Sequence, residues 1–379
     1  MSSKMGKKKK TGKIVALSIV GVLAVLILVV IIGAWATFGT FIKAGKTIKK
    51  LDDGLYSMEY RGDYGLDEFL AQGGADNAGA LSDYLTTYLS HGFYKSESKT
   101  TENNYGCSTI CANDADGNVL FGRNFDWKDC KTMVVHTVPD NGYESISTCN
   151  LDFIGFGDDF TPDGSMEERM ESLAAIYVPL DGMNVKGLIV ADLVVGGNGD
   201  TEETHQHTGK TPVTTTTALR MMLDKCKNVD EAIELLKEYD MNSDIGANHH
   251  YAIADASGKS VVVEYVNNEM IVTDTKVVTN FYIGDSPKKG VGSKQSHDRY
   301  DKLMSFNGVA DKNKICELLE SVAQKNYPQE DGKYELTMWS IVYSPHEGDL
   351  DFYFKENFDN PYYLKFVEEG DFVKTDVNQ

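Results

Sequence analysis

Cysteine is scarce in this chain and never occurs in a close pair. Six cysteines are spread over 379 residues, at positions 107, 111, 130, 149, 226 and 316. Six cysteines in a chain of this length do not indicate a disulfide scaffold. No Cys-x-x-Cys pair occurs among them, which argues against a structural zinc cluster.

Acidic residues are absent from the first fifty positions and abundant afterwards. Those fifty residues hold ten lysines, whereas the whole chain has 37 basic and 57 acidic residues. The part beyond residue 50 is therefore strongly acidic. Because such a surface repels phosphate backbones, we expect no nucleic-acid partner. The chain also lacks internal repeats and, apart from the first lysines, low-complexity tracts.

A long apolar run follows the first lysines directly. It extends from Ile14 to Ala36 and contains no charged residue. At a rise of ~1.5 Å per residue, a helix of this length crosses the ~30 Å hydrocarbon core of a bilayer. The preceding lysines predict a cytoplasmic N-terminus and an extracellular main part at the cell membrane. A cleaved signal peptide is the alternative, because Ala34-Trp35-Ala36 resembles a small-x-small cleavage site.

The rest of the chain is expected to contain an upstream segment and one large domain. The predicted divisions are a basic cytoplasmic tail over 1–13, a transmembrane anchor over 14–36, a helical stalk or pro-segment over 37–106, and a catalytic domain over 107–379. The helical prediction rests on apolar residues that recur at helical spacing between Leu66 and Leu89.

Short strands and a few helices alternate beyond residue 106. We predict hairpins over 107–124 and 251–266, with turns at Asp114–Asn118 and Asp255–Lys259. Further strands are predicted at 133–138, 145–150, 174–179, 187–195 and 334–368. Helices are predicted over 214–239, interrupted near Asn228, and over 297–306 and 313–324, whereas 196–212 is predicted to be a loop. This mixture indicates the α+β class.

Three groups of polar residues stand out in ordered surroundings. The sequences are GCSTI at 106–110 with DGNVLFGRNFDW at 116–127, DGMNVKGL at 181–188, and VTN at 278–280 with SHDRY at 296–300. Together they resemble the choloylglycine hydrolase family, which includes bile salt hydrolases and penicillin V acylases and, more distantly, acid ceramidase and N-acylethanolamine acid amidase. The resemblance extends from Cys107 to about Arg299.

The resemblance implies a fold, a reaction and a set of site residues. The fold would be the four-layer αββα sandwich of the N-terminal-nucleophile (Ntn) hydrolases, and the reaction would be hydrolysis of a linear amide, with no cofactor. Cys107 would be the nucleophile, flanked by Arg123 and Asp126. Asn280 would donate its side-chain amide to the oxyanion, and Arg299 would complete the polar cluster.

Cys107 suits this chemistry only if it becomes a chain terminus. A cysteine thiol with a pKa of ~8.5 needs activation at neutral pH, because the thiolate is the nucleophile. An α-amino group, with a reference pKa of ~7.7–8.0, supplies a general base on the same residue. Autoproteolysis between Gly106 and Cys107 would expose it, and a glycine before the cut permits unusual backbone angles. Asp126 would hold the amino group, and Arg123 would favour the thiolate.

The sequence differs from the family pattern at one position, and it leaves other functions open. Val194 occupies the position where bile salt hydrolases usually carry an asparagine, so the resemblance does not imply bile-salt specificity. The other five cysteines are expected to pack as small apolar residues, and His205 and His207 without a third ligand do not predict a metal site. The expected substrate is a small-molecule N-acyl amide. Acyl transfer to an amine and an inactive, membrane-anchored binding ectodomain are the other functions, and the oligomeric state stays open.

Overall fold

The computed structural model describes residues 38–90, 106–154, 159–196, 203–243, 247–325, 327–328, 334–367 and 372–374. The predicted transmembrane helix, Ile14 to Ala36, and the predicted basic tail before it lie outside these residues. Within the described ranges no helix is both long enough and apolar enough to cross a bilayer.

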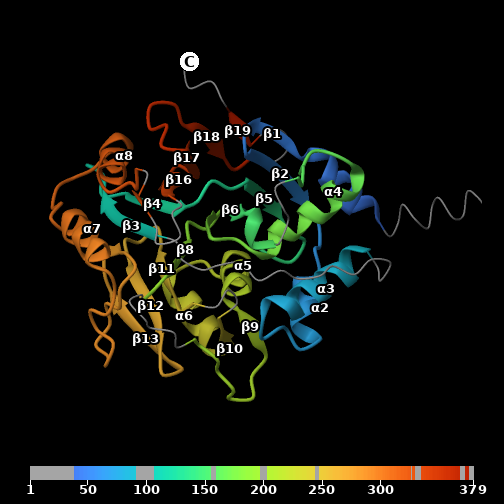
Figure 1. Ribbon diagram of the computed structural model, residues 1–379, viewed down its shortest axis with the longest axis horizontal. Helices are drawn as coiled ribbons and strands as arrows, with labels where there is room; N and C mark the ends of the chain where they lie inside the picture. The colour runs from blue at the N-terminus through green and yellow to red at the C-terminus, as the bar shows by residue number, and fades with distance from the viewer. Residues whose placement is uncertain are drawn as a thin grey trace, which may run out of the picture.

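Two β-sheets packed face to face form the centre of the molecule (Figure 1). In the described residues the larger sheet has nine strands, and all neighbouring pairs except β2–β5 are antiparallel. In spatial order its strands are β1 (Lys49–Asp52), β2 (Leu55–Arg61), β5 (Thr132–Val138), β6 (Ser145–Asn150), β7 (Asp181–Asn184), β8 (Ile189–Val194), β11 (His249–Ala254), β12 (Ser260–Val266) and β13 (Glu269–Asp274).

The second sheet carries the residues around Cys107. The described residues give it eight antiparallel strands. Its order is β14 (Val277–Val278), β3 (Gly106–Asn113), β4 (Val119–Trp127), β16 (Tyr334–Ser344), β17 (Asp349–Phe354), β18 (Tyr362–Lys365) and β19 (Val373–Lys374), with β15 (Tyr327–Pro328) paired to β16. A separate parallel pair joins β9 (Pro212–Thr214) to β10 (Asp240–Asn242).

Helices form the two outer layers. They are α2 (Leu66–Ala71), α3 (Ala78–Ser90), α4 (Met166–Glu171), α5 (Thr215–Lys225), α6 (Val229–Lys237), α7 (Lys294–Met304) and α8 (Lys312–Ser321), with short 3-10 helices η1 (Leu151–Ile154) and η2 (Ser172–Tyr177); residues 38–47 are also helical. Polar residues cap five of them by accepting a backbone N–H of the first turn: Ser165, Thr214, Asn228, Ser293 and Asp311.

Three apolar clusters hold the layers together. The first packs α5 and α6 against the nine-stranded sheet, for example through Leu219 and Val190. The second fills the space between the sheets and includes Phe125 and Met183. The third packs α7 and α8 onto the eight-stranded sheet, where Leu319 belongs to the same cluster as Ile110. This order of layers is the αββα arrangement that the family resemblance implies.

Two expectations about local structure are wrong. Residues 37–106 are not a purely helical stalk, because β1 and β2 lie in the nine-stranded sheet and β2 runs parallel to β5. The helices α2 and α3 fall within the predicted helical spacing. Residues 174–179 are not a strand; Ser172–Tyr177 is a 3-10 helix whose six residues are all buried. An apolar run of that length does not distinguish a buried strand from a buried helical turn.

Candidate active site

Cys107 is the second residue of β3 and is completely buried. Its strand pairs with β4, which returns after the Asp114–Asn118 turn and brings Phe125 opposite Cys107. The Sγ atom lies 3.4 Å from Nη1 of Arg123 and 3.9 Å from the carbonyl oxygen of Asp192. Burial raises the pKa of the Cys107 thiol to about 12, and the charge of Arg123 acts in the opposite direction. In the uncleaved chain the thiol is therefore neutral.

Arg123 projects from β4 and has no exposed surface. Its Nη2 donates to the carbonyl oxygen of Asp192 at 2.9 Å, and its Nε lies 2.6 Å from Oδ2 of Asp181. Asp181 also accepts hydrogen bonds from the Trp339 indole and the Tyr343 hydroxyl, each at 2.9 Å. The ion-pair partner of Arg123 is thus Asp181, not Asp126. A buried charge requires such a partner, and this one fixes the guanidinium beside the thiol.

Asp181 was not among the predicted site residues. It is the first residue of the 181–188 stretch on which the family resemblance partly rests, so the sequence contained a signal for it. As the first residue of β7, Asp181 faces the other sheet, where its carboxylate contacts Arg123, Trp339 and Tyr343.

Asp126 lies near the end of β4, directly opposite Gly106. Its Oδ1 accepts a hydrogen bond from the Thr337 hydroxyl at 2.7 Å, and its Oδ2 lies 3.4 Å from Nη1 of Arg299. Burial raises the pKa of the Asp126 carboxyl, whereas Arg299 and Thr337 act to lower it. The carboxylate therefore stands beside the peptide group that joins residues 106 and 107.

Gly106 is needed for space at this point. A Cβ atom at position 106 would lie 2.8 Å from Oδ2 of Asp126, closer than real Cβ contacts come. Gly106 belongs to β3 and is not among the glycines with positive φ. The expected unusual backbone angle is therefore absent, and the contact with Asp126 explains the glycine.

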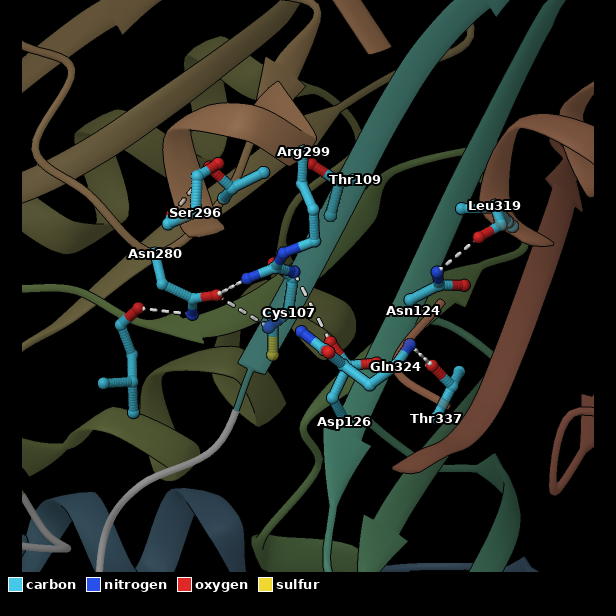
Figure 2. A network of polar contacts seen from close by, with 12 residues as sticks. Cys107, Thr109, Asn124, Asp126, Asn280, Ser296, Arg299, Leu319, Gln324 and Thr337 are labelled. Atoms are coloured by element: carbon cyan, nitrogen blue, oxygen red, sulfur yellow. Dashed lines mark hydrogen bonds and ion pairs between the residues drawn. The ribbon is translucent and has the colours of Figure 1, made fainter. Parts of the chain in front are cut away.

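Asn280 follows β14 and reaches the start of β3 (Figure 2). Its Oδ1 accepts from the backbone N–H of Cys107 at 2.8 Å, and its Nδ2 donates to the carbonyl oxygen of Val194 at 2.7 Å. In the uncut chain the side chain therefore holds the nitrogen of Cys107. The donation to an oxyanion stays a prediction, because the amide NH2 group carries a second hydrogen. Val194, at the position of the missing asparagine, supplies the carbonyl that orients it.

Arg299 connects the other residues from α7. Its Nη1 donates to the carbonyl oxygen of Cys107 at 2.6 Å, and its Nη2 donates to Oδ1 of Asn280 at 2.8 Å. Figure 2 shows Arg299, Asn280 and Asp126 pointing toward the start of β3. Thus the structure brings all five predicted residues, Cys107, Arg123, Asp126, Asn280 and Arg299, into one buried cluster drawn from two strands, a loop and a helix.

The histidines outside this cluster make local contacts. His205 lies 3.0 Å from a carboxylate oxygen of Glu203 and 3.4 Å from the Asn242 amide oxygen. Within the described ranges no three side chains of the metal-ligating types gather in one place.

Comparisons with known proteins agree with this architecture. The sequence profile of the acyl-coenzyme A:6-aminopenicillanic acid acyl-transferase family matches residues 174–359, which include Asn280 and Arg299 but not Cys107. No curated protein sequence matches the chain.

Among solved structures, a mutant of the conjugated bile acid hydrolase of Clostridium perfringens superposes with a TM-score of 0.52 at 20% identity, covering 72% of this chain and 97% of the other. Penicillin V acylase from Agrobacterium tumefaciens gives a TM-score of 0.49 at 16% identity, covering 69% and 87%. The layers shared with the bile acid hydrolase define an Ntn-hydrolase fold. The family match and this fold together support the resemblance to the choloylglycine hydrolase and other Ntn-hydrolase families.

Proposed function

We propose that the chain is a hydrolase of linear amides whose nucleophile, Cys107, is exposed by cleavage of the peptide bond after Gly106. The observation that carries this proposal is the pair of contacts made by Cys107. Its nitrogen lies 2.8 Å from Oδ1 of Asn280, and its sulfur lies 3.4 Å from the Arg123 guanidinium. The two atoms that an N-terminal nucleophile uses each have a buried polar partner.

Cleavage would use the same thiol. Sγ of Cys107 attacks the carbonyl carbon of Gly106, the bond to the Cys107 nitrogen breaks, and that nitrogen takes the thiol proton. Water then hydrolyses the resulting thioester, which leaves a carboxylate on Gly106 and a free thiol and amine on Cys107. Arg299, bound to the carbonyl oxygen of Cys107, and Asp126, packed against Gly106, hold the two sides of the scissile bond.

Amide hydrolysis would repeat this sequence on a substrate. The α-amino group takes the thiol proton, the thiolate attacks the substrate carbonyl carbon, and the ammonium returns the proton to the departing amine. Water then releases the acid from the acyl-enzyme. Asn280 accepts a hydrogen bond from the amino group and directs its lone pair toward Sγ, while Arg123 stabilises the thiolate.

The substrate class we propose is a small N-acyl amide. The support is the shared fold with a hydrolase of conjugated bile acids, which are small acyl compounds. Val194 replaces the asparagine expected in bile salt hydrolases, which separates this chain from their specificity. A panel of conjugated bile acids, N-acyl amino acids and penicillin V would distinguish these acyl groups.

We also propose that residues 14–36 anchor the protein in the cell membrane with the catalytic part outside. The support is the uncharged apolar run behind a lysine cluster. Protease added to intact cells should remove the catalytic part, and an epitope placed before Lys7 should stay protected. Protection of the catalytic part would contradict this orientation.

The central test is the intact mass and N-terminal sequence of the purified ectodomain. The wild type should yield a chain that begins at Cys107 and should release amine from N-acyl substrates. Cys107→Ala should yield one uncut, inactive chain. A wild type that is never cut at this bond would refute the processing step, and an active Cys107→Ala variant would refute the nucleophile.

Acyl transfer is the second candidate, favoured by the matching acyl-transferase profile. An acyl-enzyme on Cys107 reacts with an amine as readily as with water if the amine binds in the site. Adding a primary amine acceptor should then give a new amide at the expense of free acid. Unchanged release of acid over a range of amine concentrations would leave hydrolysis as the reaction.

A further inference from the structure

A buried histidine and a buried glutamate face each other across β11 and β12. His250 and Glu264 are directly opposite in the strand register, and both side chains have no exposed surface. Nδ1 of His250 lies 3.0 Å from Oε1 of Glu264. Nε2 of the same ring lies 2.8 Å from the carbonyl oxygen of Thr279. The pair thus connects the nine-stranded sheet with the chain that follows β14.

These contacts determine the proton count of the ring. A carbonyl oxygen only accepts hydrogen bonds, and so does an ionised carboxylate. Burial alone would raise the pKa of the Glu264 carboxyl, but the hydrogen bond and charge of His250 and two backbone N–H donors together lower it. Both ring nitrogens of His250 thus face oxygen atoms that accept hydrogen bonds when Glu264 is ionised, and a ring that donates from both nitrogens satisfies them.

Glu264 holds the other end of the same loop. Its Oε1 accepts from the N–H of Ile283 at 2.9 Å, and its Oε2 accepts from the N–H of Gly284 at 2.7 Å. A Cβ atom at position 284 would lie 2.7 Å from Oε2, so the close approach depends on glycine. The ion pair therefore fixes residues 279–284 at both ends, through the carbonyl of Thr279 and the N–H groups of Ile283 and Gly284.

Asn280 lies inside this fixed segment, next to Thr279. Its side chain bridges Val194, Cys107 and Arg299, with the Cys107 nitrogen at 2.8 Å. Thr279 is also tied to α7, because its hydroxyl donates to the Ser296 carbonyl oxygen at 3.0 Å. Displacement of Thr279 by the loss of His250 would therefore shift the backbone that carries Asn280.

We propose that the buried His250–Glu264 ion pair is a positioning device that aligns Asn280 with the nitrogen of Cys107 for both self-cleavage and amide hydrolysis. The proposal rests on the proposed function of Cys107. His250 touches neither the nucleophile nor the substrate, so it acts through Asn280 and its effect must disappear when Asn280 is removed.

A second buried histidine supplies a matched control. His136 on β5 lies 3.2 Å from Oε2 of Glu59 and 2.7 Å from Oε1 of Glu144, and it is also completely buried. Three strands of the same sheet separate β5 from β11. The two histidines share burial and carboxylate pairing, but only His250 contacts the loop of Asn280.

The experiment compares His250→Leu, Glu264→Gln and His136→Leu in the full chain. We expect His250→Leu and Glu264→Gln to lower kcat by roughly 10- to 100-fold with KM changed less than about threefold, and to slow cleavage after Gly106, because small misplacements of catalytic groups cost rate. His136→Leu should lower the thermal stability comparably and leave kcat within about twofold. If His250→Leu does not fold, the nearly isosteric Glu264→Gln still tests the proposal.

A double-mutant cycle identifies the path of the effect. In an Asn280→Ala background, Glu264→Gln should change kcat and the cleavage rate by less than about twofold, because the group that it positions is gone. Additive losses, or a folded Glu264→Gln variant with the kcat and cleavage rate of the wild type, would overturn the proposal. A wild type with neither cleavage nor amidase activity would instead refute the function of Cys107.

The protonation of the His250 ring can be measured directly by NMR spectroscopy. In ¹H–¹⁵N spectra of histidine-labelled protein at neutral pH, both ring nitrogens of His250 should carry protons. The signal should change to that of a neutral ring in Glu264→Gln, since the carboxylate that balances the charge is lost. A neutral His250 in the folded wild type would contradict the ion pair.

Discussion

The chain before Gly106 and the chain after Cys107 enter the molecule in different ways. Before the proposed cut, β2 runs parallel to β5 over seven paired positions, and Leu55, Met58 and Tyr60 are buried in the core. After the cut, β3 and β4 carry Cys107 and Arg123. The upstream part supplies packing, whereas the downstream part supplies every polar group of the cluster.

This difference indicates that the upstream segment is held in the fold by its contacts and not by the peptide bond between Gly106 and Cys107. β2 pairs with its downstream neighbour by backbone hydrogen bonds and apolar contacts, none of which depends on the Gly106–Cys107 bond. Tyr64 adds a buried hydrogen bond to Asp224, which also pairs with Arg220 at 2.7 Å. We therefore expect cleavage to change the chemistry of Cys107 without releasing the upstream segment.

The largest expected effect is that of Cys107→Ser. A hydroxyl at this position is a far weaker nucleophile than a thiol, so amidase activity should fall by at least about 10³-fold. Cleavage should be slowed strongly, and the upstream and downstream parts should remain one chain. Intact mass and substrate turnover measure both effects. If Cys107→Ser keeps the wild-type turnover, the downstream part does not supply its nucleophile through Cys107.

Arg299→Lys should have the next largest effect. A lysine cannot bond the Cys107 carbonyl oxygen and Asn280 Oδ1 with a planar fork, so turnover should fall by about 10²-fold. Steady-state kinetics and circular dichroism would separate this loss from unfolding. As a control, Arg61→Lys changes a partly exposed arginine on β2 and should leave turnover unchanged.

Retention of the upstream segment is tested by gel filtration after complete cleavage. The two parts should elute together and separate only in denaturant. Tyr64→Phe removes the hydroxyl that bonds Asp224 and should lower the unfolding free energy by ~1–3 kcal/mol with little change in turnover. Spontaneous separation of the wild-type parts in native buffer would show that the upstream part contributes less packing than described.

The smallest effect concerns the dependence of stability on pH. Burial, reinforced by the charge of Asp126 and opposed by that of Arg299, raises the pKa of Glu335 to about 8. Because the folded state keeps this proton while the unfolded state releases it near pH ~4.3, stability falls as the pH rises between these values. Glu335→Gln should therefore be more stable than the wild type at pH 8, on the order of 1 kcal/mol.

Denaturant titrations at pH 5 and pH 8 measure that difference. The advantage of Glu335→Gln over the wild type should be larger at pH 8 than at pH 5. An equal advantage at both values would indicate that Glu335 is ionised throughout this range.

The sequence predicted helices and hairpins well where the signal lies within a few neighbouring residues. The hairpin at 107–124 and the helices around Leu219 and Arg299 follow from turn residues, caps and apolar spacing. The strands β1 and β2 were missed because each residue of β2 pairs with a residue of β5 that lies 77 positions later in the chain. Non-local pairing of this kind leaves little trace in a single segment.

The sequence predicted which residues belong to the site better than it predicted the contacts of their side chains. Motif resemblance selected five residues that the structure brings together, and Arg123 lies beside the Cys107 thiol as expected. It did not name the partners that orient Arg123 and Asn280. Those partners are Asp181 and Val194, which lie on β7 and β8 of the other sheet.

The missing Cβ of Gly106 has a consequence for engineering the protein. The carboxylate of Asp126 occupies the volume where any larger side chain would stand, so a library randomised at position 106 in the uncut chain should retain glycine almost alone. A gene that expresses residues 38–105 separately and begins the second polypeptide at Cys107 has no residue 106. The requirement for glycine at position 106 therefore applies to the uncut precursor and not to an enzyme made as two separate polypeptides.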